Sequence, residues 1–127
     1  MLLRLDFSAD VPIYMQIRNQ VVVAIAEGKL TAGEQLPTIR ALATEAGINM
    51  MTVSKAYQTL KTEGYIATDR RSGAVVTGDV KRVLSENALE YLRVIVAEAK
   101  LSGMSKTDLL KLCEDCFEAS PVATILN

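Results

Sequence analysis

The sequence predicts a mainly helical fold, and three observations support this prediction. Two short helical segments at 38–64 are joined by a turn that contains a glycine, an apolar stripe at helical spacing precedes them, and two more apolar segments at helical spacing follow residue 80. The chain has 127 residues, half of them hydrophobic, which is enough for one compact core. We therefore expect a small helical domain with a helical appendage.

The first predicted helix begins at Pro12, because the start of a helix tolerates proline. An apolar stripe at helical spacing then runs to a point just before Gly28, and its members are Ile13, Ile17, Val21, Ala24 and Ile25. Such a stripe predicts a helix with one face in the core.

The following segment has the signature of a helix-turn-helix. Thr38 is suited to cap the first helix of the pair, and Leu42, Ala43 and Ala46 form a small apolar face that lets a second helix approach closely. Gly47 then ends this first helix.

The second helix of the pair is expected to start at Asn49 or Thr52, either of which can cap it. Residues at i, i+3, i+4 and i+7 are expected to face the core, namely Val53, Ala56, Tyr57 and Leu60. Residues at the opposite angle are expected to point outward, namely Met51, Lys55, Gln58 and Thr62. A polar, partly basic face near a helix N-terminus fits a DNA major groove.

Two motifs then make a resemblance specific. Leu-Pro-Thr-x-Arg-x-Leu-Ala at 36–43 and Asn-x-x-Thr-Val-x-x-Ala-Tyr-x-x-Leu-x-x-Glu-Gly-Tyr-Ile at 49–66 resemble the winged-helix domain of the GntR family of bacterial transcription regulators, and the match runs from about residue 12 to residue 77. The resemblance implies an α+β fold: a winged helix-turn-helix domain at 1–78, followed by a short two-helix dimerisation tail at 79–127. Among GntR relatives, a tail this short is similar to the YtrA-type branch, which implies control of a transporter operon.

The resemblance also implies a hairpin, the wing, after the second helix. Its strands are expected at 65–69 and 74–77, around the turn at 70–73. The family wing usually carries Gly-x-Gly followed by threonine and an aromatic residue, whereas this chain has Arg71-Ser72-Gly73-Ala74-Val75. The extra arginine partly compensates for the missing glycine.

From these arguments the candidate DNA-binding residues are Thr38, Arg40, Asn49, Met51, Thr52, Ser54, Lys55, Arg70, Arg71 and Gly73. For Arg40, the alternative is a solvated helix arginine, and for Asn49 a cap that makes no DNA contact. The wing arginines are expected at the minor groove or at phosphates. Gln58 and Thr62 lie farther along the helix and are expected to face solvent. The expected partner is double-stranded DNA with a two-fold symmetric operator, and the sequence names no small-molecule effector.

The overall charge does not by itself indicate a nucleic-acid partner. The chain carries 14 basic and 15 acidic residues, and its pI is near 5.5. Residues 1–78 hold 8 basic and 7 acidic residues, a net charge of +1, and residues 79–127 have a net charge of −2. We therefore expect few phosphate contacts per subunit, with affinity that depends on two subunits binding together.

The tail is predicted to hold a helix at about 81–101, ended by Gly103, and a second helix opened by a capping box at 105–108. Their apolar arcs are too wide for two helices to bury within one chain, so we expect a homodimer. The candidate interface residues are Leu84, Ala88, Tyr91, Leu92, Ile95, Leu109, Leu110, Cys113 and Phe117.

Cys113 and Cys116 are three residues apart on the second tail helix. Their spacing permits a redox pair or half of a zinc site shared across a dimer. Because both lie on an apolar face, buried packing is the preferred interpretation.

Several functional classes are disfavoured. The chain contains no histidine, which removes Ser-His and Cys-His catalytic pairs and every zinc pattern that needs histidine. We expect a cytoplasmic protein that is not an enzyme and has no cofactor, no metal and no membrane partner, since the apolar stretches are too short to span a bilayer. The alternative to DNA binding is a winged-helix module for protein–protein assembly.

Overall fold

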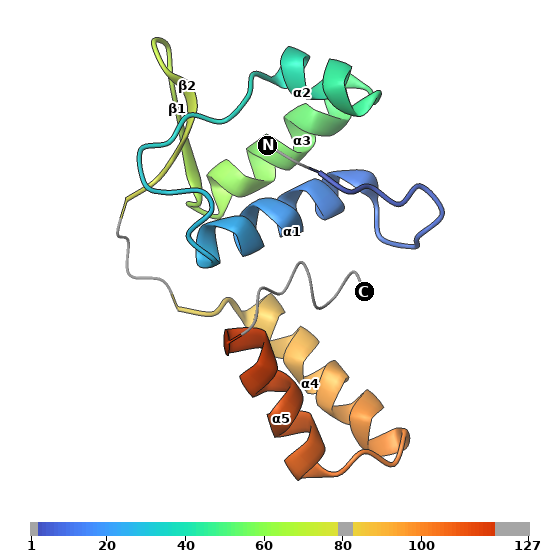
Figure 1. Ribbon diagram of the computed structural model, residues 1–127. Helices are drawn as coiled ribbons and strands as arrows, with labels where there is room; N and C mark the ends of the chain where they lie inside the picture. Colours follow the sequence, from blue (N-terminus) through green and yellow to red (C-terminus); the bar gives the residue numbers. More distant parts are fainter. Residues whose placement is uncertain (1–2, 79–82, 119–127) are drawn as a thin grey trace. The chain divides into compact units, whose positions relative to one another are not determined.

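The computed structural model describes residues 3–78 and 83–118, which fall into two compact units, 1–80 and 81–127. The first unit holds α1 (Ile13–Ala26), α2 (Ile39–Ala46), α3 (Met50–Thr62), β1 (Ile66–Asp69) and β2 (Gly73–Val76) (Figure 1). The second unit holds α4 (Glu86–Leu101) and α5 (Lys106–Glu118). The fold is therefore α+β, with the helices predicted from the sequence and one short hairpin.

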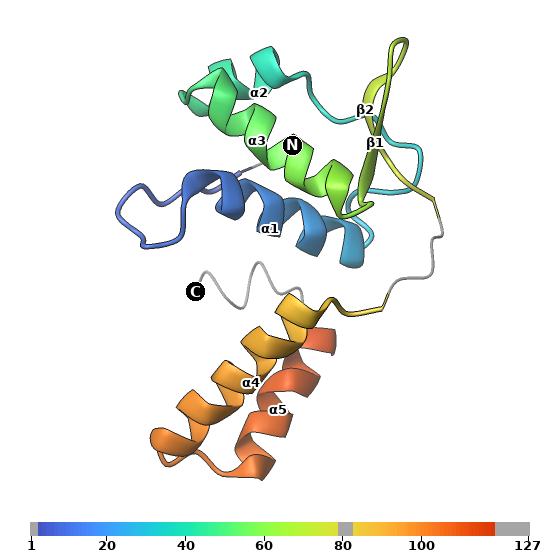
Figure 2. The same cartoon turned by 180° about the vertical axis from the view of Figure 1, so that it is seen from behind.

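The core of the first unit forms where α1 lies against α3, and both views of the molecule show these helices side by side (Figures 1 and 2). Ile17 and Val21 from α1 and Val53 and Leu60 from α3 are completely buried. In the described part of the chain, every buried apolar residue lies between residues 17 and 76. The predicted stripes thus face the core of the first unit.

The starts of α2 and α3 are fixed by side-chain caps, and α2 ends at a glycine. The Thr38 hydroxyl accepts a hydrogen bond from the Ala41 backbone N–H at 3.0 Å, and the Asn49 side chain accepts one from the Met51 backbone N–H at 2.6 Å. Gly47 adopts a left-handed conformation with φ of 68°, which a residue with a side chain rarely adopts. Of the two predicted caps for α3, Asn49 is therefore the one used.

The hairpin pairs β1 with β2 in antiparallel register, from Ile66 opposite Val76 to Asp69 opposite Gly73. β1 begins one residue later than predicted and ends at the predicted residue, whereas β2 begins and ends one residue earlier than predicted. The segment at 33–36 adds a short third edge, since its backbone exchanges hydrogen bonds of 2.8 to 2.9 Å with β2 at Ala74 and Val76. This edge was not predicted, and it ties the loop before α2 to the wing.

Residues 3–6 lie along α1 and are held there by two glutamine side chains. The Gln20 amide accepts from the Arg4 backbone N–H at 2.9 Å and donates to the Arg4 carbonyl at 2.7 Å. The Gln16 amide likewise accepts from the Asp6 backbone N–H and donates to the Asp6 carbonyl, both at 2.8 Å. Each side-chain amide thus satisfies the N–H and the carbonyl of one backbone residue, as a neighbouring strand would.

The second unit differs from the prediction at its start. The Ser85 hydroxyl accepts from the Ala88 backbone N–H at 3.0 Å, so α4 begins at Glu86 and not at 81, and Leu84 precedes the helix. The predicted cap of α5 is confirmed, because the Ser105 hydroxyl accepts from the Asp108 backbone N–H at 3.1 Å. No helix in the described ranges is long and apolar enough to cross a membrane.

Neither α4 nor α5, both of which the structure describes in full, has a buried side chain. Tyr91 is 68% exposed, Ile95 is 53% exposed and Phe117 is 93% exposed. Cys113 and Cys116 are also exposed, so their expected burial is wrong for the single chain. The physical reason is that two helices of this length cover only one side of each other.

Candidate nucleic-acid interface

The start of α2 and the start of α3 are both exposed to solvent. Thr38, Arg40 and Asn49 are exposed, and both cap side chains are already engaged by backbone N–H groups. In the first turns of α3, Met51 is 79% exposed, and Ser54 is exposed as well. The structure therefore presents the predicted outward face of α3 to solvent. Thr52 is half-buried and lies closer to the core than predicted.

Lys55 has a partner that the sequence did not indicate. Its ammonium lies 4.2 Å from the centre of the Tyr14 ring, near the start of α1. A cation over an aromatic face is attracted by the ring quadrupole. Lys55 is thus held beside the α1 N-terminus while its side chain stays exposed.

We predict that the Tyr14 ring and Lys55 are energetically coupled. Tyr14→Leu removes the aromatic face and should abolish a coupling of about 0.5–1 kcal/mol, whereas Tyr14→Phe should retain it because the ring remains. Urea unfolding of a double-mutant cycle with Lys55→Met measures this coupling. Equal costs of Lys55→Met in the wild-type and Tyr14→Leu backgrounds would contradict the prediction.

The wing carries two exposed arginines, Arg70 and Arg71, at its turn. The Arg71 backbone N–H donates to the Asp69 carboxylate at 2.7 Å, which closes the turn, and Gly73 follows with φ of 69°. In both views the tip of the hairpin rises to the height of α2 (Figures 1 and 2). The wing arginines therefore lie in the exposed turn of the hairpin.

Some charged side chains of the first unit form ion pairs with one another, and others do not. Arg18 donates two hydrogen bonds of 2.8 Å to the Glu63 carboxylate, and Lys29 lies 2.9 Å from Glu27. Two of the carboxylates in this unit are thereby neutralised by arginine or lysine.

Six cations of this unit, taken within the ranges that the structure describes, take part in no ion pair: Arg4, Arg40, Lys55, Lys61, Arg70 and Arg71. Apart from Arg4, which precedes α1, they come from α2, α3 and the wing. Exposed cations without an ion pair can bind phosphate oxygens, whose negative charge neutralises them. The local charge thus fits DNA better than the net charge of +1 suggested.

Tyr57 fixes the loop that leads into α2. Its hydroxyl donates to the Pro37 carbonyl at 2.8 Å, directly before the Thr38 cap. Burial raises the pKa of Tyr57 to about 12, so the phenol stays protonated and able to donate. Tyr57 is therefore the core residue that the sequence predicted, and it also positions the start of α2.

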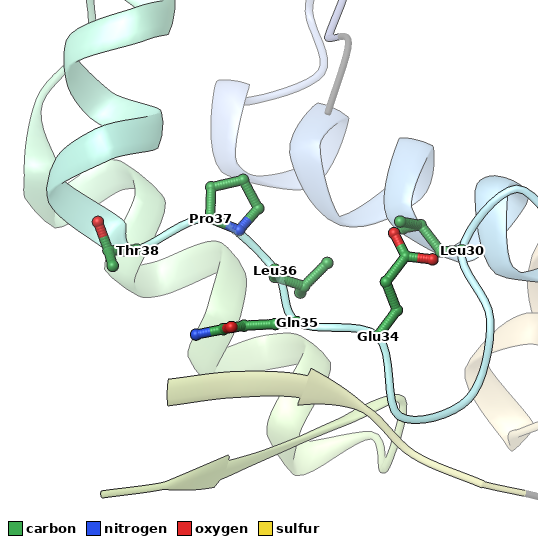
Figure 3. Close-up of a pocket in the computed structure, with 6 residues that line it drawn as sticks. All are labelled: Leu30, Glu34, Gln35, Leu36, Pro37 and Thr38. Atoms are coloured by element: carbon green, nitrogen blue, oxygen red, sulfur yellow. The ribbon is translucent and has the colours of Figure 1, made fainter. Parts of the chain in front are cut away.

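A cavity of about 430 Å³ lies beside this loop, lined by Leu30 and by residues 34–38. Figure 3 shows the Glu34 side chain turned toward Leu30 and the Gln35 side chain directed the other way. Glu34 already accepts from the Thr31 backbone N–H at 3.2 Å. This lining offers neither a nucleophile nor an acid–base pair, and within the described ranges no three His, Cys, Asp or Glu side chains are grouped to hold a metal ion.

The candidate interface residues of the tail are largely accessible in the single chain. Ala88 and Leu109 are half-buried, and the exposed members are Leu84, Tyr91, Leu92, Ile95, Leu110, Cys113 and Phe117. Leu84 is the one member outside a helix. The others lie on α4 and α5 and give each helix an uncovered apolar surface.

Comparisons with known proteins agree with this geometry. The family model of the bacterial regulatory proteins of the gntR family matches residues 13–76, which span α1 to β2. The chain is 34% identical to the HTH-type transcriptional repressor YtrA of Bacillus subtilis over 123 residues, covering 94% of this chain and 92% of that protein. The tail is therefore included in the similarity.

Two solved structures resemble the whole chain. YtrA from Sulfolobus acidocaldarius, a GntR-family transcription factor, is 39% identical with a TM-score of 0.59, covering 88% of this chain and 93% of that one. A transcriptional antiterminator from Listeria monocytogenes EGD-e is 27% identical with a TM-score of 0.77, covering 94% and 95%. The family and the YtrA relatives are transcription regulators and not enzymes. The chain belongs to the GntR family, in its YtrA-type branch, and is a DNA-binding transcription regulator.

Proposed function

We propose that the protein is a homodimeric repressor that recognises a two-fold symmetric operator, with α3 of each protomer in a major groove. The observation that carries the proposal is the contrast between the two units. The first unit has a complete core and an exposed, capped and cationic surface, whereas the second has apolar helices without one buried side chain. One unit thus supports DNA contact and the other supports self-association.

The DNA-facing surface in this proposal consists of the exposed start of α2, the first turns of α3 and the wing. Arg40 and Lys55 supply positive charge beside α3, and Arg70 and Arg71 supply it at the wing. Side chains at the N-terminal end of a recognition helix reach base edges, and flanking cations bind phosphates. The similarity to the YtrA repressor of Bacillus subtilis supports repression. The resemblance to the YtrA-type branch makes a transporter operon the expected target.

The alternative, a winged-helix module for protein–protein assembly, draws support from the low net charge alone. It gives no reason for the five cations without an ion pair that the described α2, α3 and wing carry. DNA binding therefore accounts for more of the surface than assembly does.

We predict that the protein selects inverted repeats from a pool of random duplexes. A two-fold dimer presents two identical α3 helices, so each needs a half-site, with centres about 10 bp apart or a multiple of it. Sequencing of the bound fraction gives the repeat, and footprinting gives its symmetry. Selection of an asymmetric half-site contradicts the symmetric model, and failure to enrich any sequence at low salt contradicts sequence-specific binding.

A further inference from the structure

We propose that a groove between α3 and the wing binds a phosphate of the DNA backbone, with Lys61 as its cation. The proposal rests on the proposed function and adds a contact that the sequence motifs do not assign. The groove has a volume of about 280 Å³ and is open at the surface. Part of its lining is apolar, from Leu36, Pro37, Ile39 and Ala74. Its polar lining comes from Gln35, Thr38, Ser54, Tyr57, Gln58, Lys61 and Thr68.

The position of the groove is the first argument. Its lining includes Thr38 at the start of α2, Ser54 on α3 and Gly73 at the start of β2. These three residues are candidate DNA contacts from three different elements. On the proposed binding mode, the DNA backbone that passes from α3 to the wing runs over the surface between them, where this groove lies.

The charge of the groove is the second argument. No lining residue is acidic, and Lys61 is the basic one. Glu63, two residues farther along the chain, is held by two hydrogen bonds from Arg18. Within the described residues the Lys61 ammonium has no ion-pair or hydrogen-bond partner. The groove therefore carries an uncompensated positive charge.

The neutral polar groups of the lining are the third argument. Gln58 supplies an amide, and its one side-chain hydrogen bond among the described residues is a long one of 3.5 Å to the Thr62 hydroxyl. Ser54 and Thr68 supply hydroxyls. Hydroxyl and amide donors beside a lysine are the groups that proteins use for phosphodiester oxygens. Gln58, which the sequence analysis expected to face solvent, thus donates a hydrogen bond to the phosphate in this proposal.

Lys61→Gln tests this contact, with Lys100→Gln as the matched control. Both lysines lie in the last turn of a helix and are exposed, but Lys100 is in the other unit. With a selected duplex, Lys61→Gln should weaken binding roughly three- to tenfold and reduce the slope of log K against log salt by about 0.9 per bound protomer. Lys100→Gln should change neither. An unchanged slope for Lys61→Gln, or equal losses in both variants, overturns the proposal.

A second pair of variants tests the groove itself by adding one negative charge. Gln58→Glu places the charge in the lining, whereas Thr62→Glu places it one turn farther along α3, outside the lining. Gln58→Glu should weaken binding more than Thr62→Glu, with similar melting temperatures for the two variants. Equal effects of the two changes on binding overturn the groove as the phosphate site.

Phosphate ethylation separates this proposal from the proposed function. Ethylation of one phosphate per half-site, between the major groove and the wing contact, should block binding of the wild type. The same ethylation should not affect binding of Lys61→Gln. Arg40→Ala serves as the positive control, since it should weaken binding without restoring tolerance at this phosphate. If the wild type binds no DNA, the proposed function fails. If the wild type binds and Lys61→Gln retains its full interference pattern, the groove proposal alone fails.

Discussion

Ile95→Glu will make the protein monomeric at micromolar concentration and reduce its affinity for a two-half-site operator by about 10²–10⁴-fold, the range expected when linked binding is lost. Ile95 is 53% exposed in the single chain and lies midway along α4, whose apolar face is uncovered. A carboxylate there would have to be buried without a partner if a second copy covered the face. Sedimentation velocity measures the assembly, and gel shifts measure the affinity.

The matched control is Asn87→Glu, which adds the same charge to an exposed polar position in the first turn of α4. This variant should remain dimeric, because a negative charge near a helix N-terminus is tolerated. On a duplex with one half-site, wild type and Ile95→Glu should bind alike, since the first unit has its own core. A dimeric Ile95→Glu protein would place the interface elsewhere, and a monomer with full operator affinity would refute linked binding.

Leu60→Ala is expected to have the largest effect on stability, about 2–5 kcal/mol of the free energy of unfolding of the first unit. Leu60 is completely buried, and α3 lies against α1 where Ile17 and Val21 are also completely buried. Small domains have a total stability of only about 5–15 kcal/mol, so a cavity at this position removes a large part of it. Urea unfolding should show a lower midpoint with little change in slope.

Leu60→Met is the control at the same position. It conserves the side-chain volume and should cost less than about 1.5 kcal/mol. Operator affinity near physiological temperature should fall for Leu60→Ala in step with the unfolded fraction and recover at low temperature. An equal loss of stability for both variants would show that Leu60 is not tightly packed.

Local sequence signals predicted most of the fold, because the relevant interactions are short-range. Thr38 and Ser105 cap the helices that their positions indicated, and Gly47 ends α2 in the left-handed conformation. Val53, Ala56, Tyr57 and Leu60 are buried at the predicted spacing of α3. Caps and helical periodicity can be recognised within a few residues of the chain.

Other features depend on contacts that no local pattern encodes. The segment at 33–36 is too short for strand periodicity and takes its form from hydrogen bonds with β2. Val83 and Leu84 extend the apolar pattern of the tail, but Ser85 provides a better helix start after them. Likewise, the ring of Tyr14 meets Lys55 only because α1 packs on α3. Thr38, Lys61 and Thr68, which are far apart in the sequence, line one groove only in the folded unit.

The absence of any buried side chain in α4 and α5, both described in full, has a consequence for gene dosage. On the proposed dimer, protomers below the dissociation constant form dimers in proportion to the square of their concentration. Halving the synthesis of the protein would then lower the occupancy of an unsaturated operator about fourfold. The number of copies per cell would itself act as a regulatory input, steeper than for a regulator that binds as a preformed unit.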